Sequence, residues 1–267
     1  IIMLSNLDIK KKFERDGYIV LDLINKNFLL DIKSNLALLI NNSYINNNIK
    51  INHNPNCLNS TINEGMINLE SVDHKLLSNI YDTLPRSTFF LKLISSDSLT
   101  KKIKLLLNLK NKSNFYTNSV CMRMDVPGVI KFNYGWHIDE NTNITGSNFI
   151  QLWAPMFENA TKKNGALEII IQSHKLKLET NMTKSEQEKL GKINRSDYNK
   201  VKFINKKGEK LISKHIPVRI GQVILFKKNL YHRSGIINES KMRYAMTSFY
   251  HDISDKSFTY ENMYNFA

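Results

Sequence analysis

Apolar residues recur at intervals of three and four through the first part of the chain, which predicts amphipathic helices there. The pattern indicates four helices, at residues 7–16, 28–40, 76–84 and 99–109. Ser5 and Gly17 flank the first, because serine caps the start of a helix well and glycine commonly ends one. The Asn-rich stretch that follows the second helix, as far as Asn63, shows no such period, so we expect it to be irregular.

From about Phe115 the pattern changes to short runs rich in β-branched and aromatic residues, which predicts strands. These runs lie at 115–124, 149–157, 167–171, 216–220, 223–226 and 243–250, and one earlier run of the same kind lies at 18–23. Turn residues separate them, as at Pro127-Gly128 and Asn164-Gly165. Helices followed by a β-rich part that closes on itself favour a jelly roll over a parallel α/β sheet. We expect one domain over 1–267, with a mainly helical part at 1–114 and a jelly-roll core at 115–250 with a basic insertion at about 175–215.

The positive charge of the chain is concentrated in that insertion. The formal net charge is +14, and residues 175–219, with 13 basic and 5 acidic side chains, supply +8 of it. The chain has 31 Lys and 7 Arg, and Arg is the residue whose planar fork grips phosphate and guanine. We therefore expect no nucleic-acid partner, and either a solvated surface or one that attracts an anionic substrate. Thr183 and Glu186 form a capping box that predicts a short helix inside the insertion.

Cysteine usage and hydropathy indicate the cellular setting. Cys57 and Cys121 are too few for a disulfide framework and lack the spacing of a metal finger. A reducing, cytoplasmic setting fits this usage best. No run approaches the ~18 apolar residues that cross a bilayer, and no export signal is recognisable, so we expect no membrane association.

Two of the histidines have the spacing of metal ligands. His137 and Asp139 lie two residues apart, and alternate residues of an extended strand point to the same side. His232, after a later apolar strand, could supply a second imidazole. Two imidazoles and one carboxylate on one face of an octahedral ion leave three adjacent positions free, as in non-haem Fe(II) oxygenases. The same ligand types also suit zinc in a hydrolase.

A basic residue beyond these ligands points to a carboxylate-containing cosubstrate. Arg243 follows His232 by eleven residues, on the next strand-like run. A buried Arg there would hold a carboxylate bidentately, which fits a dicarboxylate that chelates Fe(II) through a 2-oxo acid. Ser234 could add a hydroxyl donor to the same carboxylate. Arg123 and Asp125 share one side of their strand and are candidates for the cavity wall.

Several short motifs follow one another along the chain: Phe13-Glu14-Arg15-Asp16-Gly17-Tyr18-Ile19-Val20-Leu21, Pro127-Gly128, His137-Ile138-Asp139, Trp153-Ala154-Pro155-Met156, Asn164-Gly165-Ala166-Leu167-Glu168, Gln172-Ser173-His174 and Gly221-Gln222-Val223-Ile224-Leu225-Phe226. In this order they resemble the motifs of the phytanoyl-CoA dioxygenase family of Fe(II)- and 2-oxoglutarate-dependent oxygenases. The resemblance covers nearly the whole chain. Two positions depart from it: Ile138 stands where Gln is common, and Gln172 stands where Gly usually precedes the Ser-His pair. Neither departure removes a ligand.

The resemblance implies a mainly β fold with flanking helices, the cupin-like double-stranded β-helix. It implies Fe(II), 2-oxoglutarate as cosubstrate and O2, with hydroxylation of an unactivated C–H bond and release of succinate and CO2. It also implies roles for six residues: iron ligation by His137, Asp139 and His232, and cosubstrate binding by Arg243, Ser234 and Trp153.

The substrate stays open at this point. The family accepts acyl-CoA thioesters, amino acids, sugars and natural-product intermediates, and the basic insertion is compatible with a small or carrier-linked anionic metabolite. Two other functions also stay open. One is a non-catalytic binding module whose basic surface holds an anionic partner, and the other is a metal-dependent hydrolase. Nothing in the sequence indicates an oligomeric state.

Overall fold

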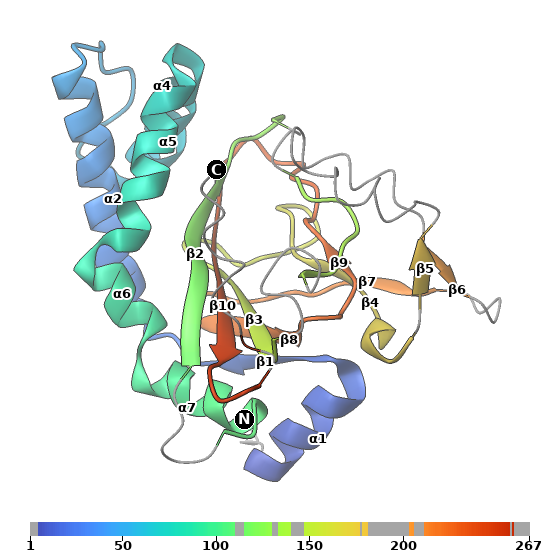
Figure 1. The fold of residues 1–267 in the computed structure, drawn as a ribbon. Helices are drawn as coiled ribbons and strands as arrows, with labels where there is room; N and C mark the ends of the chain where they lie inside the picture. Colours follow the sequence, from blue (N-terminus) through green and yellow to red (C-terminus); the bar gives the residue numbers. More distant parts are fainter. Residues whose placement is uncertain are drawn as a thin grey trace, which may run out of the picture.

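The computed structural model of the chain describes residues 5–109, 115–129, 133–139, 147–176, 178–180, 203–205, 211–256 and 258. The helical part contains α1 (Asn6–Asp16), α2 (Lys26–Asn46), α3 (Leu58–Ser60), the π-helix η1 (Thr61–Gly65), α4 (Met66–Val72), α5 (His74–Thr83), the 3-10 helix η2 (Leu84–Arg86), α6 (Thr88–Ile94) and α7 (Asp97–Leu106). The strands are β1 (Tyr18–Asp22), β2 (Phe115–Asp125), β3 (Phe149–Pro155), β4 (Glu168–Ile170), β5 (Leu178–Thr180), β6 (Phe203–Asn205), β7 (Ser213–His215), β8 (Gln222–Lys227), β9 (His232–Arg233) and β10 (Arg243–Asp252). Figure 1 shows the helices α2 and α4 to α6 alongside the strands, with α1 below them.

Two antiparallel sheets form the main β part. The larger has five strands in the order β1-β8-β3-β10-β2, and the smaller has three in the order β7-β4-β9, while β5 and β6 pair separately as a two-stranded sheet. Side chains from both sheets share one apolar cluster, for example Trp153 and Phe226 from the first and Ile169 from the second. Two sheets packed face to face in this way confirm the predicted double-stranded β-helix with flanking helices.

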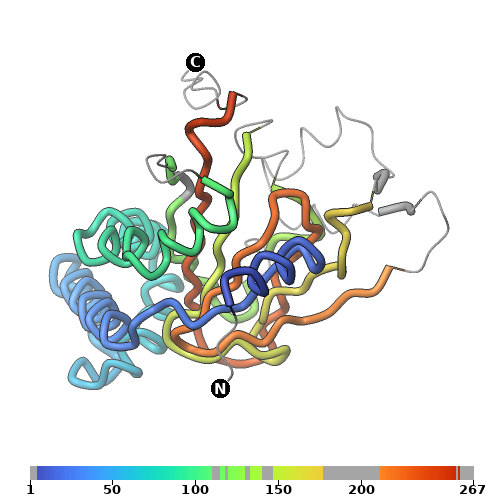
Figure 2. Tube along the Cα trace, turned by 90° about the horizontal axis from the view of Figure 1, so that it is seen from below, coloured from blue at the N-terminus to red at the C-terminus, as the bar shows by residue number. Residues whose placement is uncertain are grey.

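Alternation along the strands divides the large sheet between two cores. In β8, Val223 and Leu225 join the cluster formed with the helices, whereas Ile224 and Phe226 join the cluster between the sheets. The same alternation runs through β3, where Leu152 packs toward the helices. Seen from below, the helices α2 to α6 gather on one side of the strands (Figure 2). Functional side chains on the inner face therefore lie inside the barrel.

The first helix is bounded as its sequence predicts. Ser5 accepts a hydrogen bond from the backbone N–H of Asp8 at 3.1 Å, and Gly17 ends the helix with a φ of 82°. That left-handed conformation suits glycine, which has no Cβ. The chain then enters β1, which pairs along β8 from Tyr18↔Phe226 to Asp22↔Gln222.

The expectation of an irregular Asn-rich stretch is confirmed for residues 47–57, which form no helix or strand, and wrong on either side of them. Helix α2 continues to Asn46, and residues 58–72 are helical as α3, η1 and α4. Tyr44 extends the four-residue spacing of Leu36 and Ile40, and all three are fully buried. Tertiary burial of this apolar face outweighs the weak helix propensity of the intervening asparagines.

The strand expected at 216–220 is wrong, because the strand in this region, β7, lies just before it at Ser213–His215. Pro217 lacks the N–H that a sheet ladder needs, and only an isolated bridge joins Val218 to Ala160. The short helix expected from Thr183 and Glu186 falls outside the described residues.

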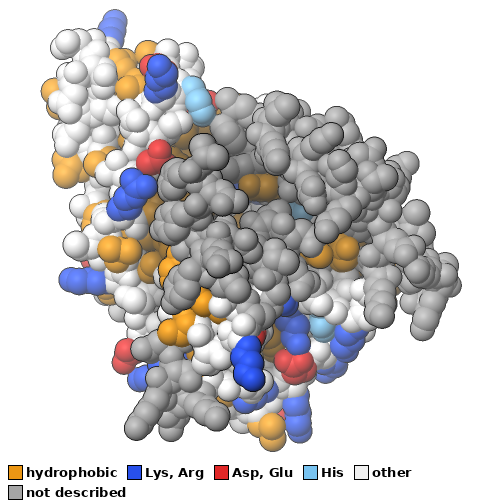
Figure 3. All heavy atoms as spheres, viewed as in Figure 1, with side chains coloured by type: hydrophobic (Ala, Val, Ile, Leu, Met, Phe, Trp, Pro, Cys, Tyr) orange, Lys and Arg blue, Asp and Glu red, His pale blue; other side chains and the backbone are white. Residues whose placement is uncertain are grey.

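Charge and hydropathy are mixed on the described surface. On the face shown in Figure 3, the described Lys and Arg side chains stand apart from one another or beside acidic ones. No helix among the described residues is long and apolar enough to cross a membrane.

Candidate metal centre

Three of the residues singled out by spacing come together inside the barrel. His137 and Asp139 lie on the segment between β2 and β3, and His232 opens β9. The backbones of His137 and His232 form a bridge with N–H···O distances of 3.0 and 3.1 Å. Their side chains and that of Asp139 are buried, and one ligand atom from each lies within 4.8 Å of the others.

The two histidines are fixed with one nitrogen facing the centre. Nδ1 of His137 donates to the carbonyl of Gly135 at 2.7 Å, and Nδ1 of His232 donates to the carbonyl of Leu230 at 2.9 Å. These bonds set the tautomer and leave each Nε2 with its lone pair. The Asp139 carboxylate lies 3.6 Å from Nε2 of His137 and 3.2 Å from Nε2 of His232. Two imidazoles and a carboxylate are thus oriented as metal ligands, so the donor set fits a divalent transition ion.

The ionisation states of the centre suit metal binding. Burial, together with the proximity of His232, lowers the pKa of His137 to about 4. Burial acts to raise the pKa of Asp139, but the proximity of His232 and a hydrogen bond from Gln151 outweigh it and hold that pKa below its usual value. A neutral imidazole and an ionised carboxylate are the forms that bind a metal.

Aromatic rings enclose the centre. The ring of Tyr134 lies 5.0 Å from that of His137, and the ring of Phe226 meets His232 edge-on at 4.8 Å. Trp136 stacks on the guanidinium of Arg233 at 4.8 Å. Tyr134 and Phe226 therefore line the metal centre directly, while Trp136 is engaged by a cation.

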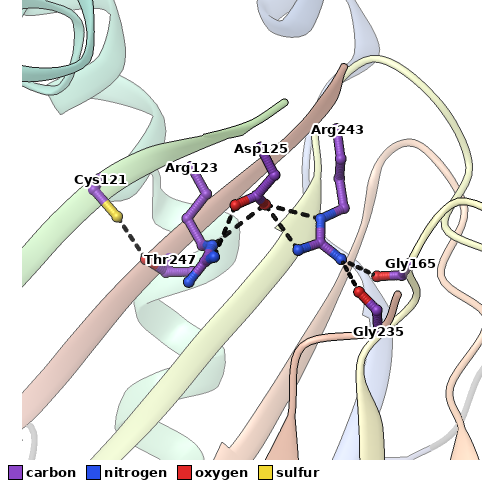
Figure 4. Close-up of polar contacts among 7 residues, drawn as sticks. All are labelled: Cys121, Arg123, Asp125, Gly165, Gly235, Arg243 and Thr247. Atoms are coloured by element: carbon purple, nitrogen blue, oxygen red, sulfur yellow. Dashed lines mark hydrogen bonds and ion pairs between the residues drawn. The ribbon is translucent and has the colours of Figure 1, made fainter. Parts of the chain in front are cut away.

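A cluster of three charged side chains, of which Asp125 and Arg243 are buried and Arg123 is half-buried, lies on the inner face of β2 and β10. The Asp125 carboxylate accepts from Nη2 of Arg123 at 2.8 Å and from Nε of Arg243 at 2.9 Å, and Nη2 of Arg243 lies 2.8 Å away (Figure 4). Sγ of Cys121 and Oγ1 of Thr247 form a neighbouring contact of 2.9 Å. The guanidinium of Arg123 also covers the ring of Tyr134 at 5.3 Å, which connects this cluster to the metal centre.

Arg243 is buried, as expected, but the carboxylate that it holds in this structure belongs to the protein. Its Nη1 donates to the carbonyls of Gly165 at 2.6 Å and Gly235 at 2.8 Å. The Arg243 guanidinium has five N–H groups. The Nε N–H and one Nη2 N–H are directed at Asp125, and the two Nη1 N–H groups donate to the carbonyls of Gly165 and Gly235. One Nη2 N–H has no partner among the described residues.

The cluster keeps a net positive charge. Burial acts to raise the pKa of Asp125, yet Arg123 and Arg243 together lower it to about 2. Burial lowers the pKa of Arg243, but guanidinium remains charged because its ordinary pKa exceeds 12. Two cations and one anion leave one positive charge inside the barrel.

The other two cosubstrate candidates lie near Arg243. Trp153 is buried on β3, and it lines the same cavity of about 30 Å³ as Arg243. Ser234 precedes Gly235, whose carbonyl binds Arg243, and its backbone N–H donates to the carbonyl of Tyr134 at 2.9 Å. The hydroxyl of Ser234 makes no hydrogen bond within the described part of the chain.

One residue beside the metal centre was not singled out from the sequence. Gln151 of β3 is buried and hydrogen-bonded to Asp139. The sequence contains a signal for it, because Gln151 is the one polar residue of Phe149–Pro155 and all the remaining residues are apolar or aromatic. A lone amide in a buried strand usually has a polar partner inside the protein.

One departure from the family motifs has a clear backbone consequence. Gln172 has a φ of 56°, in the left-handed region that glycine adopts most easily. The turn thus keeps the backbone shape of a glycine. The side chains after it are bonded, with Oγ of Ser173 accepting from the N–H of Tyr231 at 2.9 Å and Nε2 of His174 donating to the carbonyl of Glu14 at 3.1 Å.

Comparison with known proteins gives one family and several solved structures. The sequence model described as Phytanoyl-CoA dioxygenase (PhyH) matches residues 91–245, more than half of the chain. No curated protein matches.

The solved structures share the fold at low sequence identity. EctD from S. alaskensis with 2-oxoglutarate and 5-hydroxyectoine has a TM-score of 0.58 and 19% identity, covering 94% of this chain and 77% of its own. The non-heme alpha ketoglutarate dependent epimerase SnoN from nogalamycin biosynthesis has a TM-score of 0.56 and 10% identity, covering 92% and 83%. AviO1 from Streptomyces viridochromogenes Tue57 has a TM-score of 0.53 and 13% identity, covering 95% and 98%. At identities this low, the structural similarity establishes a common fold and no more.

Proposed function

The chain belongs to the phytanoyl-CoA dioxygenase family, an oxygenase family, and on that premise we propose that it is an Fe(II)- and 2-oxoglutarate-dependent hydroxylase. The observation that carries the proposal is the convergence of His137, Asp139 and His232, with each imidazole fixed so that Nε2 faces the centre. EctD, which has this fold, was solved with 2-oxoglutarate bound, which supports the same cosubstrate here.

The three ligands would hold the iron through two nitrogens and one carboxylate oxygen. Bound Fe(II), with 2-oxoglutarate and O2, supplies oxidative decarboxylation to succinate and CO2 coupled to hydroxylation of a C–H bond. The carbonyls of Gly135 and Leu230 keep both imidazoles in the metal-binding tautomer. Three protein ligands leave adjacent positions for cosubstrate and O2.

Arg243, Ser234 and Trp153 would bind the cosubstrate. The arginine offers the distal carboxylate of 2-oxoglutarate one Nη2 N–H and the net positive charge that it shares with Arg123 and Asp125. The Ser234 hydroxyl would add a second donor, and Trp153 an apolar wall. Asp125 stays in place in this arrangement, because moving it would leave a buried carboxylate without Arg243.

The substrate that we propose is a small or carrier-linked metabolite. EctD, which shares this fold, was solved with 5-hydroxyectoine, a small molecule. The Lys-rich residues 175–219, which carry +8, favour an anionic group on that substrate. The two cysteines are free thiols, which fits the cytoplasmic location that we propose.

We also propose that the chain forms one domain. Helix residues such as Leu36 and Leu99 share a continuous hydrophobic cluster with Leu152 and Met246 of the large sheet. Shared burial of this kind couples the folding of the two parts.

Anaerobic titration tests the function. We expect Fe(II) and 2-oxoglutarate to bind together with a visible charge-transfer band, and admission of O2 to yield succinate. Screening metabolites for faster 2-oxoglutarate turnover then identifies the substrate. A protein that retains zinc, binds no 2-oxoglutarate and forms no succinate would be a hydrolase, and one that binds no metal would be a binding module.

A further inference from the structure

Gln151 occupies the inner face of the sheet, next to the metal centre. Its side chain is 6% exposed, and alternation along β3 places it on the same side as Trp153. Across the sheet it is paired with Phe226, whose ring contacts His232 at 4.8 Å. A polar amide therefore lies among the residues that enclose the ligands.

The two ends of this amide have different surroundings. The carboxylate of Asp139 can only accept, so the NH2 end of Gln151 donates to it. The carbonyl oxygen Oε1 is buried and has no hydrogen-bond partner among the described residues. Buried acceptors without partners are rare in native proteins and commonly mark the place of a bound water, ion or ligand donor.

The carboxylate that Gln151 contacts has two oxygens directed at the histidines, at 3.6 Å from Nε2 of His137 and 3.2 Å from Nε2 of His232. Without a further partner, both oxygens could bind one ion. A carboxylate bound through both oxygens would take a position that the cosubstrate or O2 needs.

We propose, on the basis of the function proposed above, that Gln151 is a positioning residue of the metal centre. Its amide N–H engages one oxygen of Asp139, so that this carboxylate ligates through the other oxygen alone. Its Oε1 accepts a hydrogen bond from a donor at the open side of the centre, which is water in the resting enzyme. Gln151 thereby keeps three adjacent positions available.

Gln222 provides a matched control. It is also a strand glutamine whose Nε2 donates to an aspartate, Asp22, at 3.2 Å, but it lies at the exposed end of β8. Co(II) serves as the probe because its visible absorption reports both affinity and coordination. We expect the Kd for Co(II) to rise about 10–100-fold in Gln151→Met, with an altered visible spectrum. The metal-free Tm should fall modestly, since the substitution removes the donor to the buried Asp139 carboxylate. Gln222→Met should keep the wild-type Kd and spectrum.

A wild-type Kd and spectrum in Gln151→Met would overturn the inference, whether or not the Tm changes. If that variant does not fold, Gln151→Asn, which is one methylene too short to reach Asp139, must show the same loss of affinity. Failure of the wild-type protein to bind Co(II) would instead overturn the proposed function, so the two failures are distinguishable.

Discussion

Asp125 and Arg243 face each other across β2 and β10 and form a buried ion pair of 2.8 Å. The arginine is at once a candidate cosubstrate ligand and a structural link between two strands and two backbone carbonyls. Replacing it by alanine would leave the Asp125 carboxylate with Arg123 alone and remove the donors to Gly165 and Gly235. Loss of binding and loss of stability would then be hard to separate in such a variant.

Arg243→Lys is therefore the sharper substitution. Lysine keeps a positive charge near Asp125 but cannot present the planar fork. We expect affinity for 2-oxoglutarate to fall by about tenfold or more, which is about 1.4 kcal/mol, while Co(II) affinity stays unchanged. Isothermal titration with each ligand checks this.

Arg219→Lys is the control for that substitution, because Arg219 pairs with Asp22 at 3.9 Å on the surface. It should leave both affinities at wild-type values. Unchanged 2-oxoglutarate affinity in Arg243→Lys would remove Arg243 from the cosubstrate site.

Asp125→Asn should destabilise the protein strongly. Both oxygens of Asp125 accept from arginines, and the amide would leave two cations without an anion. Breaking a buried pair in this way costs about 3–5 kcal/mol. Urea unfolding at neutral pH measures the loss, and Asp97→Asn, at an exposed pair with Lys101, should change stability by less than about 0.5 kcal/mol.

The effect of Asp125→Asn should depend on pH. The pKa of Asp125 is lowered to about 2 in the folded protein, against about 3.9 in an unfolded chain. The stabilisation is therefore fully present above about pH 4 and is lost as the pH falls toward 2. The difference in unfolding free energy between wild type and variant should narrow over that interval. A constant difference would show that the carboxylate charge is not what stabilises the cluster.

Gly165→Ala should disturb the placement of Arg243. Gly165 has a φ of 84°, and an added Cβ would collide with Nη1 of Arg243. Gly128 is the matched control, because its φ of 76° imposes similar backbone strain while nothing lies within 4 Å of an added Cβ. The free energy of unfolding should fall by about 1 kcal/mol in both variants, because alanine is strained at a positive φ. Gly165→Ala alone should weaken 2-oxoglutarate binding, as titration would show, and equal binding by the two variants would contradict this.

His251 should make the fold sensitive to mild acid. It is fully buried, and its Nδ1 lies 2.8 Å from the hydroxyl of Ser147. Burial, with Lys228 nearby, lowers its pKa to about 4 from about 6.5 in the unfolded chain. Stability from this group is present above about pH 6.5 and is lost as the pH falls through 4. Over that range the wild type should lose about 3 kcal/mol more than His251→Gln in urea unfolding, and equal slopes would contradict the assignment.

The sequence could locate the centre because its ligands follow simple rules. His137 and Asp139 are two residues apart, which brings them to one side of an extended segment. Arg243 follows His232 by eleven residues, on the next strand-like run. Gln151 and the bond from Asp125 to Arg243 depend on how β3, β2 and β10 align. That alignment is set by long-range pairing, which local patterns do not encode.

The end of helix α2 likewise depends on tertiary contacts that the local sequence does not show. The apolar spacing in 28–40 predicts α2 well, but its extension to Asn46 depends on the burial of Tyr44, whose hydroxyl donates to the carbonyl of Gly65. Propensity alone ends that helix too early, because asparagine is weak in helices and only tertiary contacts compensate.

The position of β1 has a consequence for how this protein can be divided. The segment that matches the family, residues 91–245, contains β8 but not β1, which covers one edge of β8 over five register positions. A protein that lacked β1 but kept the rest of the chain would present that edge of β8 bare, with Val223 and Leu225 losing part of their cover. Unprotected edges of this kind recruit strands from other copies. We therefore expect β1 to protect the sheet against self-association, and a protein without it should form oligomers or precipitate even with its metal ligands intact.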